Sequence, residues 1–213
     1  QIKDYGGIGG LKTINIRSMG SQHVGVFYDG IQLGNAQNGV VDLGRFSLDD
    51  IEEISLYNGQ KSEIFQPAKD FGSSGSIYFQ PKTPNFKFNK KTNLVLRLKN
   101  SSIDLFNPSF RLEQKISDKI SASFSSEFLQ SDGVYRFRYY KKYPDGALAY
   151  DTIAKRFDSD IKAKRFETSF HGTMNNGTWN VRGYGYISNR GIPSAIVNNR
   201  FDGRGQRLID ENY

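Results

Sequence analysis

The chain has 213 residues, a formal net charge of +7 and no cysteine, which excludes disulfides, thiolate nucleophiles and cysteine-based zinc sites. Aromatic residues make up 14% of it and glycine occurs 22 times, a composition that favours strands and turns over helices. No apolar run approaches the roughly 18 residues of a membrane-spanning helix, and the basic residues are scattered, so we expect no nucleic-acid partner.

Short β-type runs separated by glycine-rich turns make up the first part of the chain. They are residues 12–17, 24–28, 54–57 and 76–79. Between the second and third runs, Ser47 followed by acidic residues predicts a helix of one or two turns over residues 46–53, with Ser47 as the N-cap. The segment up to about Phe79 is therefore predicted to be a small α+β domain.

Two glycine motifs in this part predict turns and loops. Asp29-Gly30 predicts a turn in which Gly30 takes a positive φ and Asp29 caps its own backbone. The run at residues 6–10 lacks the Lys-Ser/Thr of a phosphate-binding loop and is predicted to be a flexible loop. No nucleophile, paired acid or metal-ligand motif stands in the sequence, and we expect neither His23 nor His171 to bind a metal. The sequence therefore predicts no enzyme and no cofactor.

After Lys82-Thr83-Pro84 the pattern changes to longer strands with strict alternation of apolar and polar residues. In residues 120–128, for example, Ile120 and Phe124 share one face, while Ser123 and Glu127 share the other. Strands of this kind are expected at residues 94–99, 110–116, 120–128, 166–174, 179–188 and 206–213. One face of each strand is apolar and the other carries charge.

The connections between these strands differ in length from one end to the other. Residues 117–119 and 175–177 are tight turns, whereas residues 131–160 and 189–205 are long, polar and rich in tyrosine and arginine. Bacterial outer-membrane barrels have short turns at one end and long loops at the other. A soluble β-sandwich also alternates, so a soluble β-rich module that binds glycan or protein is the alternative interpretation.

The order and spacing of motifs from Ile14 to Gly59 resemble the plug domain of TonB-dependent receptors. The motifs are Ile14-Asn15-Ile16-Arg17-Ser18-Met19-Gly20, Val24-Gly25-Val26-Phe27-Tyr28-Asp29-Gly30-Ile31-Gln32-Leu33, Val41-Asp42-Leu43 and Ile51-Glu52-Glu53-Ile54-Ser55-Leu56-Tyr57-Asn58-Gly59. Gln60-Lys61 departs from the family's usual proline, and residues 71–79 are a looser version of its glycine-rich closing motif. Residues 29–42 and 66–70 are most similar to vitamin B12 receptor homologues of Bacteroides-type bacteria.

The resemblance implies a plug domain in residues 1–84 and the first strands and loops of a transmembrane β-barrel in residues 85–213. We expect both parts to be incomplete: about six strands belong to a larger barrel, of about 22 strands in the family, and the TonB box lies ahead of Gln1. The implied protein lies in the outer membrane of a Gram-negative bacterium. Its implied function is energised uptake of a scarce nutrient such as cobalamin or a ferric siderophore. The implied partners are TonB, the nutrient, outer-membrane lipid and a surface lipoprotein.

Candidate ligand contacts lie in three polar segments. The resemblance places Asn35, Ala36, Gln37 and Asn38 at the apex of the plug, with Gln66 and Lys69 as a second apical group. Amides suit a neutral ligand because they offer both donors and acceptors. Tyr135, Arg138 and Tyr139 interleave cations with aromatic rings in the first long loop. For each segment a solvated loop is the alternative.

Overall fold

The structure, a computed structural model, describes residues 2–16, 20–34, 40–57, 75–87, 90–193 and 206–212. Its first part, here called the N-terminal unit, is built on a mixed sheet of order β4-β3-β6-β5 and a separate hairpin of β1 and β2. The elements are β1 (Ile2–Tyr5), η1 (Gly7–Gly9), β2 (Leu11–Ile14), η2 (Ser21–His23), β3 (Val24–Tyr28), β4 (Ile31–Leu33), η3 (Leu43–Arg45), β5 (Ile51–Tyr57) and β6 (Gly75–Pro81).

The second part, here called the wall, is an antiparallel sheet of six strands in the order β14-β13-β12-β9-β8-β7. Its strands are β7 (Thr92–Ser101), β8 (Leu105–Lys115), β9 (Ile120–Ser131), β12 (Ile161–Met174), β13 (Gly177–Ile192) and β14 (Gln206–Asn212). Each of the six alternating segments predicted from the sequence overlaps one of these strands, although Ile116 lies just past the end of β8 and Tyr213 lies outside the described residues. The tight turns predicted at residues 117–119 and 175–177 join β8 to β9 and β12 to β13.

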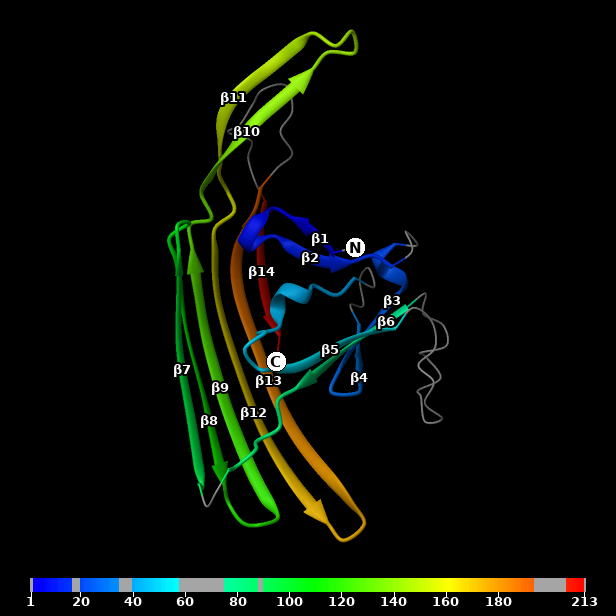
Figure 1. Cartoon of the computed structure of the whole chain (residues 1–213), viewed down its shortest axis with the longest axis vertical. Helices are drawn as coiled ribbons and strands as arrows, with labels where there is room; N and C mark the ends of the chain where they lie inside the picture. The colour runs from blue at the N-terminus through cyan, green and yellow to red at the C-terminus, as the bar shows by residue number, and fades with distance from the viewer. Residues whose placement is uncertain are drawn as a thin grey trace.

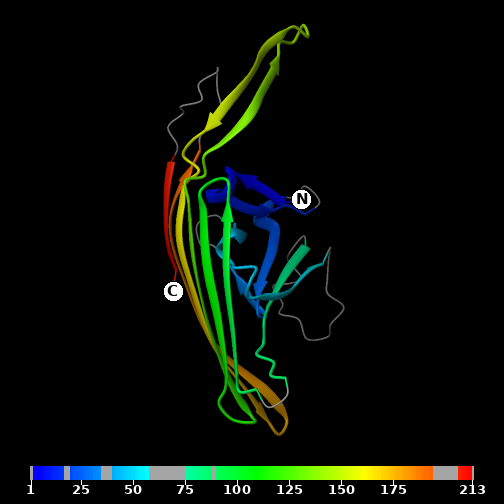
Figure 2. The same ribbon diagram turned by 60° about the vertical axis from the view of Figure 1, so that its left-hand side comes forward.

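The N-terminal unit lies against one face of the wall. Figure 1 shows the two parts side by side, and Figure 2 shows that the wall curves around the unit, which occupies its concave side. The unit has its own apolar core, formed by strand residues such as Val26 and Ile77 together with Phe46 from the turn after η3. The core also reaches the wall, because the Phe46 ring lies 6.1 Å from the Tyr184 ring of β13. Ile8 packs against the wall cluster of Ile161, Ala163 and Tyr186, and polar side chains make the other contacts described below.

The loop predicted at residues 131–160 is largely a hairpin. Strands β10 (Tyr135–Lys142) and β11 (Leu148–Arg156) pair with each other, with a bulge at Lys141/Lys142. Figure 1 shows this hairpin projecting beyond the end of the wall that lies opposite the tight turns. The polar composition of residues 131–160 predicted a loop. The structure instead has two paired strands there, which extend beyond the wall.

The helix predicted over residues 46–53 is wrong. Residues 47–50 form a turn in which the Asp50 N–H donates to the Ser47 carbonyl at 3.2 Å, and strand β5 begins at Ile51. Strand β5 pairs with β6, and this pairing satisfies more backbone groups than an isolated turn of helix. Among the described residues the helical segments are three short 3₁₀ turns and no α-helix.

No helix in the described part of the chain is long and apolar enough to cross a membrane.

Candidate functional site: the contacts between the N-terminal unit and the wall

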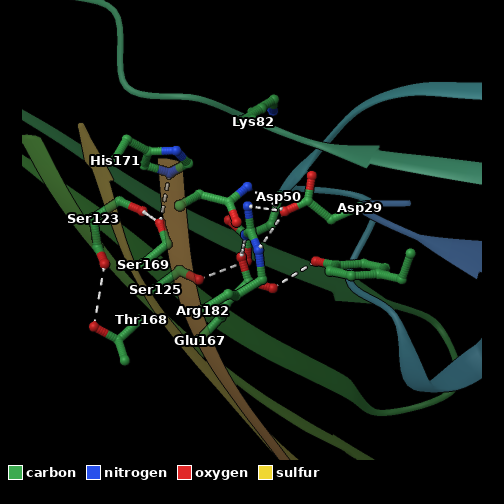
Figure 3. A network of polar contacts seen from close by, with 12 residues as sticks. Asp29, Asp50, Lys82, Ser123, Ser125, Glu167, Thr168, Ser169, His171 and Arg182 are labelled. Atoms are coloured by element: carbon green, nitrogen blue, oxygen red, sulfur yellow. Dashed lines mark hydrogen bonds and ion pairs between the residues drawn. The ribbon is translucent and has the colours of Figure 1, made fainter. Parts of the chain in front are cut away.

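The central contact starts at the tight turn between β3 and β4. Asp29 and Gly30 form this two-residue hairpin turn with φ angles of 51° and 80°, which confirms the predicted turn and the positive φ of Gly30. The turn carries the Asp29 carboxylate toward the wall, where Oδ2 lies 3.1 Å from Nη2 of Arg182 and accepts from Nδ2 of Asn180 at 2.9 Å. Figure 3 shows the resulting polar network.

Glu167 of β12 joins the same network from the wall side. It forms an ion pair with Arg182 of β13 and accepts a hydrogen bond of 2.5 Å from the Tyr28 hydroxyl. Burial and the neighbouring Glu167 carboxylate raise the pKa of Tyr28 far above its usual value. The phenol therefore stays protonated and remains a hydrogen-bond donor to the wall at any physiological pH.

A second contact joins the turn before β5 to strands β7, β8 and β9. Asp49 pairs with Lys99 of β7 at 2.7 Å, and Asp50 pairs with Arg111 of β8 at 3.3 Å. Asp50 also accepts from the Ser125 hydroxyl of β9 at 2.8 Å. Burial opposes ionisation of Asp49, but the hydrogen bond and charge of Lys99 outweigh it and lower the pKa of Asp49.

A third contact holds the segment around η3. Arg165 of β12 donates to the backbone carbonyls of Arg45 and Gly44 at 2.9 and 2.6 Å. Arg190 of β13, which is only 2% exposed, pairs with Asp42 at 2.6 Å. Two arginines on neighbouring strands thus bind backbone carbonyls and a carboxylate of the same short segment, residues 42–45.

The four ion pairs that join the described parts of the unit and the wall have the same polarity. The N-terminal unit contributes carboxylates and the wall contributes cations, as the pairs Asp29–Arg182, Asp42–Arg190, Asp49–Lys99 and Asp50–Arg111 show. Polar contacts of this kind can be replaced by contacts with water when two surfaces separate, whereas an apolar interface would expose its area to water. The arrangement suits an interface that must open.

At the turn end of the wall, the central contact borders an open cavity of about 590 Å³. Asp29, His171, Asn180 and Trp179 contribute to its lining, together with the tight turn that contains Lys119. Among the described residues no group of three or more His, Asp or Glu side chains is placed to hold a metal ion. The cavity thus lies where the unit meets the wall, and its polar lining residues are joined by apolar ones such as Phe86 and Ile120.

The first part of the chain is similar to a known protein family. Residues 1–69 match the family described as TonB-dependent Receptor Plug Domain. The first third of the chain therefore resembles this plug domain. Here "the plug" denotes the N-terminal unit through Pro81.

The structural similarity extends past the plug. A solved structure named "Copper transporter OprC" superposes with a TM-score of 0.61 at 15% sequence identity, over 89% of this chain and 26% of the transporter. The chain thus has the fold of about a quarter of that structure. No curated protein matches the sequence. The match to the plug-domain family indicates a receptor or transporter and not an enzyme.

The structure places the predicted ligand residues unevenly. Six of them, Asn35, Ala36, Gln37, Asn38, Gln66 and Lys69, lie outside the described residues. Tyr135, Arg138 and Tyr139 lie on β10 of the projecting hairpin, where Arg138 forms a two-point ion pair with Asp151 of β11. Alternation along β10 puts Arg138 on the face opposite Tyr135 and Tyr139.

The plug–wall contacts were not predicted from the sequence. The inward charges of the wall had a signal, because Arg111, Glu167 and Arg182 fall on the polar face of alternating strands. Their partners had none, since Asp29 and Arg182 are 153 positions apart. The turn with Gly30 is a sufficient role for Asp29, so nothing in the sequence indicated a contact with the wall.

Proposed function

We propose that this chain is part of a TonB-dependent receptor of a Gram-negative outer membrane that takes up a scarce nutrient, such as cobalamin or a ferric siderophore. Residues 1–84 are the plug domain, and residues 85–213 are the first strands and loops of the surrounding barrel. Energy comes from TonB, which acts on a segment ahead of the plug. A surface lipoprotein is a further partner at the loop end.

The observation that carries this proposal is the two-sided character of the wall. Its convex face exposes large apolar side chains, whereas its concave face buries charged and polar ones against the plug. The exposed side chains include Leu94, Leu96, Leu98, Leu112, Phe124, Phe166, Phe170 and Val181. An apolar surface of this extent is expected to face lipid or another apolar surface. A soluble glycan- or protein-binding module would instead pack such faces together.

In the proposed transport cycle the plug–wall contacts hold the plug in place until force from TonB separates them. Force on the plug separates Asp29 from Arg182 and Asp50 from Arg111, and water replaces each lost hydrogen bond. Opening at this seam joins the cavity at the turn end to the space above it. The nutrient then passes along a route bounded by the polar concave face of the wall.

A reversible crosslink tests whether the plug must part from the wall. The Asp50 carboxylate and the Ser125 hydroxyl are 2.8 Å apart, and the chain has no cysteine of its own, so Asp50→Cys/Ser125→Cys places one disulfide across the seam. In the full-length receptor we expect oxidation to abolish uptake of radiolabelled cyanocobalamin or ferric siderophore and reduction to restore it.

The matched control is a disulfide within the wall. The Ser123 and Ser169 hydroxyls are 2.6 Å apart on the paired strands β9 and β12, so Ser123→Cys/Ser169→Cys crosslinks two strands without touching the plug. This variant should transport equally well when oxidised or reduced. Full transport by the oxidised Asp50→Cys/Ser125→Cys receptor would show that the plug need not separate from the wall at this contact. Copper uptake is measured in parallel, because the similar structure is named a copper transporter.

The apical ligand contacts are tested separately. Asn35→Ala and Asn38→Ala in the full-length receptor should each weaken binding of the transported nutrient, measured by calorimetry, by about tenfold, the effect of losing one hydrogen bond to a buried polar ligand. Plug folding, followed by hydrogen exchange of β3 and β6, should not change. Unchanged affinity in both variants would remove these residues from the site. Tyr135→Ala, Arg138→Ala and Tyr139→Ala test the hairpin residues in the same way.

A further inference from the structure

The lipid-facing side of β12 changes character along the strand. Its outward residues are apolar in the middle of the wall, where Phe166 and Phe170 are exposed, and become Lys164 and Lys162 toward the hairpin end. The inward residues change in the opposite sense, because Ile161 and Ala163 at the same level are 4% and 1% exposed. On β12 the lysines at this level are therefore directed outward, away from the plug, whereas Arg190 of β13 is directed inward to Asp42.

The projecting hairpin extends this basic surface. Arg136, Arg138 and Lys142 share one face of β10, and Lys155 lies opposite Arg136 on β11. All four residues are exposed. The other face of β10 is turned toward the plug, since a side chain added at Gly7 would meet the Tyr135 ring at 3.5 Å. The basic face is therefore on the side of the hairpin turned away from the plug.

Apolar and aromatic groups are mixed into the basic face. Arg138 and Lys142 lie 5.6 and 5.9 Å from the centre of the Tyr140 ring, and Lys155 lies 5.2 Å from the Phe157 ring. Ile153 is 73% exposed between them. The acidic residue on this face of the two strands is Asp151, which forms an ion pair with Arg138. The remaining cations leave the face with a net positive charge, so it attracts anions.

We propose that these residues form a binding site for the phosphates of a phosphorylated glycolipid in the outer leaflet of the membrane. Lys162 and Lys164 lie just beyond the apolar band, at the depth where lipid phosphates lie, and Lys164 is the cross-strand neighbour of Phe128. The hairpin cations bind phosphates farther out, and Ile153 and Phe157 contact the glycolipid's apolar parts.

A soluble acidic protein fits the hairpin but not the two lysines. Lys162 and Lys164 project from the membrane side of the wall, where a soluble partner would have to displace lipid. A lipid phosphate reaches both groups of cations from within the leaflet. The inference rests on the proposed function, because it requires the convex face of the wall to be in a membrane.

The test uses the full-length receptor purified in a neutral detergent, with native mass spectrometry as the readout. Wild type and Lys162→Gln/Lys164→Gln are titrated with diphosphoryl lipid A and with the same lipid lacking its phosphates. We expect the variant to bind diphosphoryl lipid A about tenfold more weakly, because each basic residue near an anionic lipid surface contributes a few-fold to binding. Binding of the dephosphorylated lipid should be weak and equal in both proteins.

Two further variants separate this site from a general effect of charge. Lys87→Gln/Lys90→Gln removes the same charge at the turn end, where both lysines are exposed, and should bind like wild type. Arg136→Gln/Lys155→Gln removes a facing pair from the hairpin and should also weaken binding. Unchanged binding by Lys162→Gln/Lys164→Gln would overturn the proposal, as would equal loss in Lys87→Gln/Lys90→Gln.

Failure of the proposed function gives a different result. A wild-type receptor that stays soluble without detergent and does not fractionate with membranes would remove both proposals. A receptor that inserts into membranes normally but does not distinguish phosphorylated from dephosphorylated lipid would remove the glycolipid site alone.

Discussion

At the scale of single residues, the plug is held by buried charges with more than one partner. Arg182 contacts both Asp29 of the plug and Glu167 of the wall, and Glu167 also accepts from Tyr28. Side chains that share partners in this way are energetically coupled, so their contributions do not add. Removing one charge leaves another without compensation in a site that water reaches poorly.

Arg182→Ala should therefore weaken the docking of the plug. The Glu167 side chain is 6% exposed, and a buried charge deprived of its partner costs about 3 kcal/mol. Hydrogen exchange of strand β3 should report a lower opening free energy by about that amount. Adding Glu167→Gln should recover part of the loss, because the more buried of the two carboxylates that lose Arg182 is then neutral and only Asp29 stays without that cation. As a control, Arg138→Ala breaks an exposed ion pair and should leave the exchange of β3 unchanged.

Acidification should loosen the contact of Asp49 with the wall. The pKa of Asp49 is lowered from 3.8 in the folded protein, so ionised Asp49 stabilises docking above that value, and the stabilisation is lost as the pH falls below it. Limited proteolysis of the plug should therefore accelerate as the pH falls below about 4. Asp49→Asn should weaken docking at neutral pH and reduce this acid dependence. An identical acid dependence in wild type and variant would show that Asp49 does not contribute.

At the scale of elements, glycines allow the plug to approach the wall closely. A Cβ at Gly9 of η1 would lie 2.8 Å from the Asp160 carbonyl and 2.9 Å from the Ser159 carbonyl, both in the segment that leads into β12. Backbone atoms cannot move aside as a flexible side chain can. The contact between η1 and the wall therefore depends on the absence of a side chain at this position.

Gly9→Ala should shift the hairpin of β1 and β2 away from the wall. Overpacking of this kind costs about 1–3 kcal/mol, and we expect faster hydrogen exchange in β2 with little change in β7 or β8. Gly34→Ala is a matched control, because a Cβ there meets nothing within 4 Å. Equal exchange of β2 in the two variants would show that η1 tolerates a side chain against the wall.

At the scale of the whole molecule, two faces of one sheet are adapted to different surroundings. The concave face of the wall is charged and grips the plug, while the convex face is apolar and exposed. Alternation with a period of two residues makes this separation possible, since neighbouring residues point to opposite faces. A membrane around the convex face is what the receptor proposal requires.

A charge placed in the middle of the convex face tests that environment. Val181 is 60% exposed, so in a soluble protein Val181→Arg should be nearly neutral. In a membrane the same change should cost about 2–4 kcal/mol, whereas Gln130→Arg near the hairpin end should cost at most about 1 kcal/mol. Urea titration of each variant in lipid bilayers measures the two changes in the free energy of unfolding. Equal stability of the two variants would contradict the membrane assignment.

Much of the fold was predictable because its signals are local. The six wall strands follow from period-two alternation, and the tight turns follow from residues such as Asn175-Asn176-Gly177. The hairpin of β10 and β11 also had a local signal, in the alternation from Tyr135 to Tyr139 and in Asp145-Gly146, but the long polar segment was interpreted as a loop. The helix predicted at residues 46–53 failed because pairing of β5 with β6 overrides a weak capping signal.

The amino-acid sequence by itself determined the six wall strands, the turn at Asp29-Gly30, the plug motif and which face of each wall strand is apolar, because all of these depend on neighbours within a few positions. Only the tertiary structure decided that Asp29 meets Arg182, that Asp50 meets Arg111 and that the lysines at the end of β12 continue into the basic face of the hairpin. Each of these depends on where two distant segments meet in space. Charge alternation along a strand predicts that a partner exists across the interface, but not which residue it is.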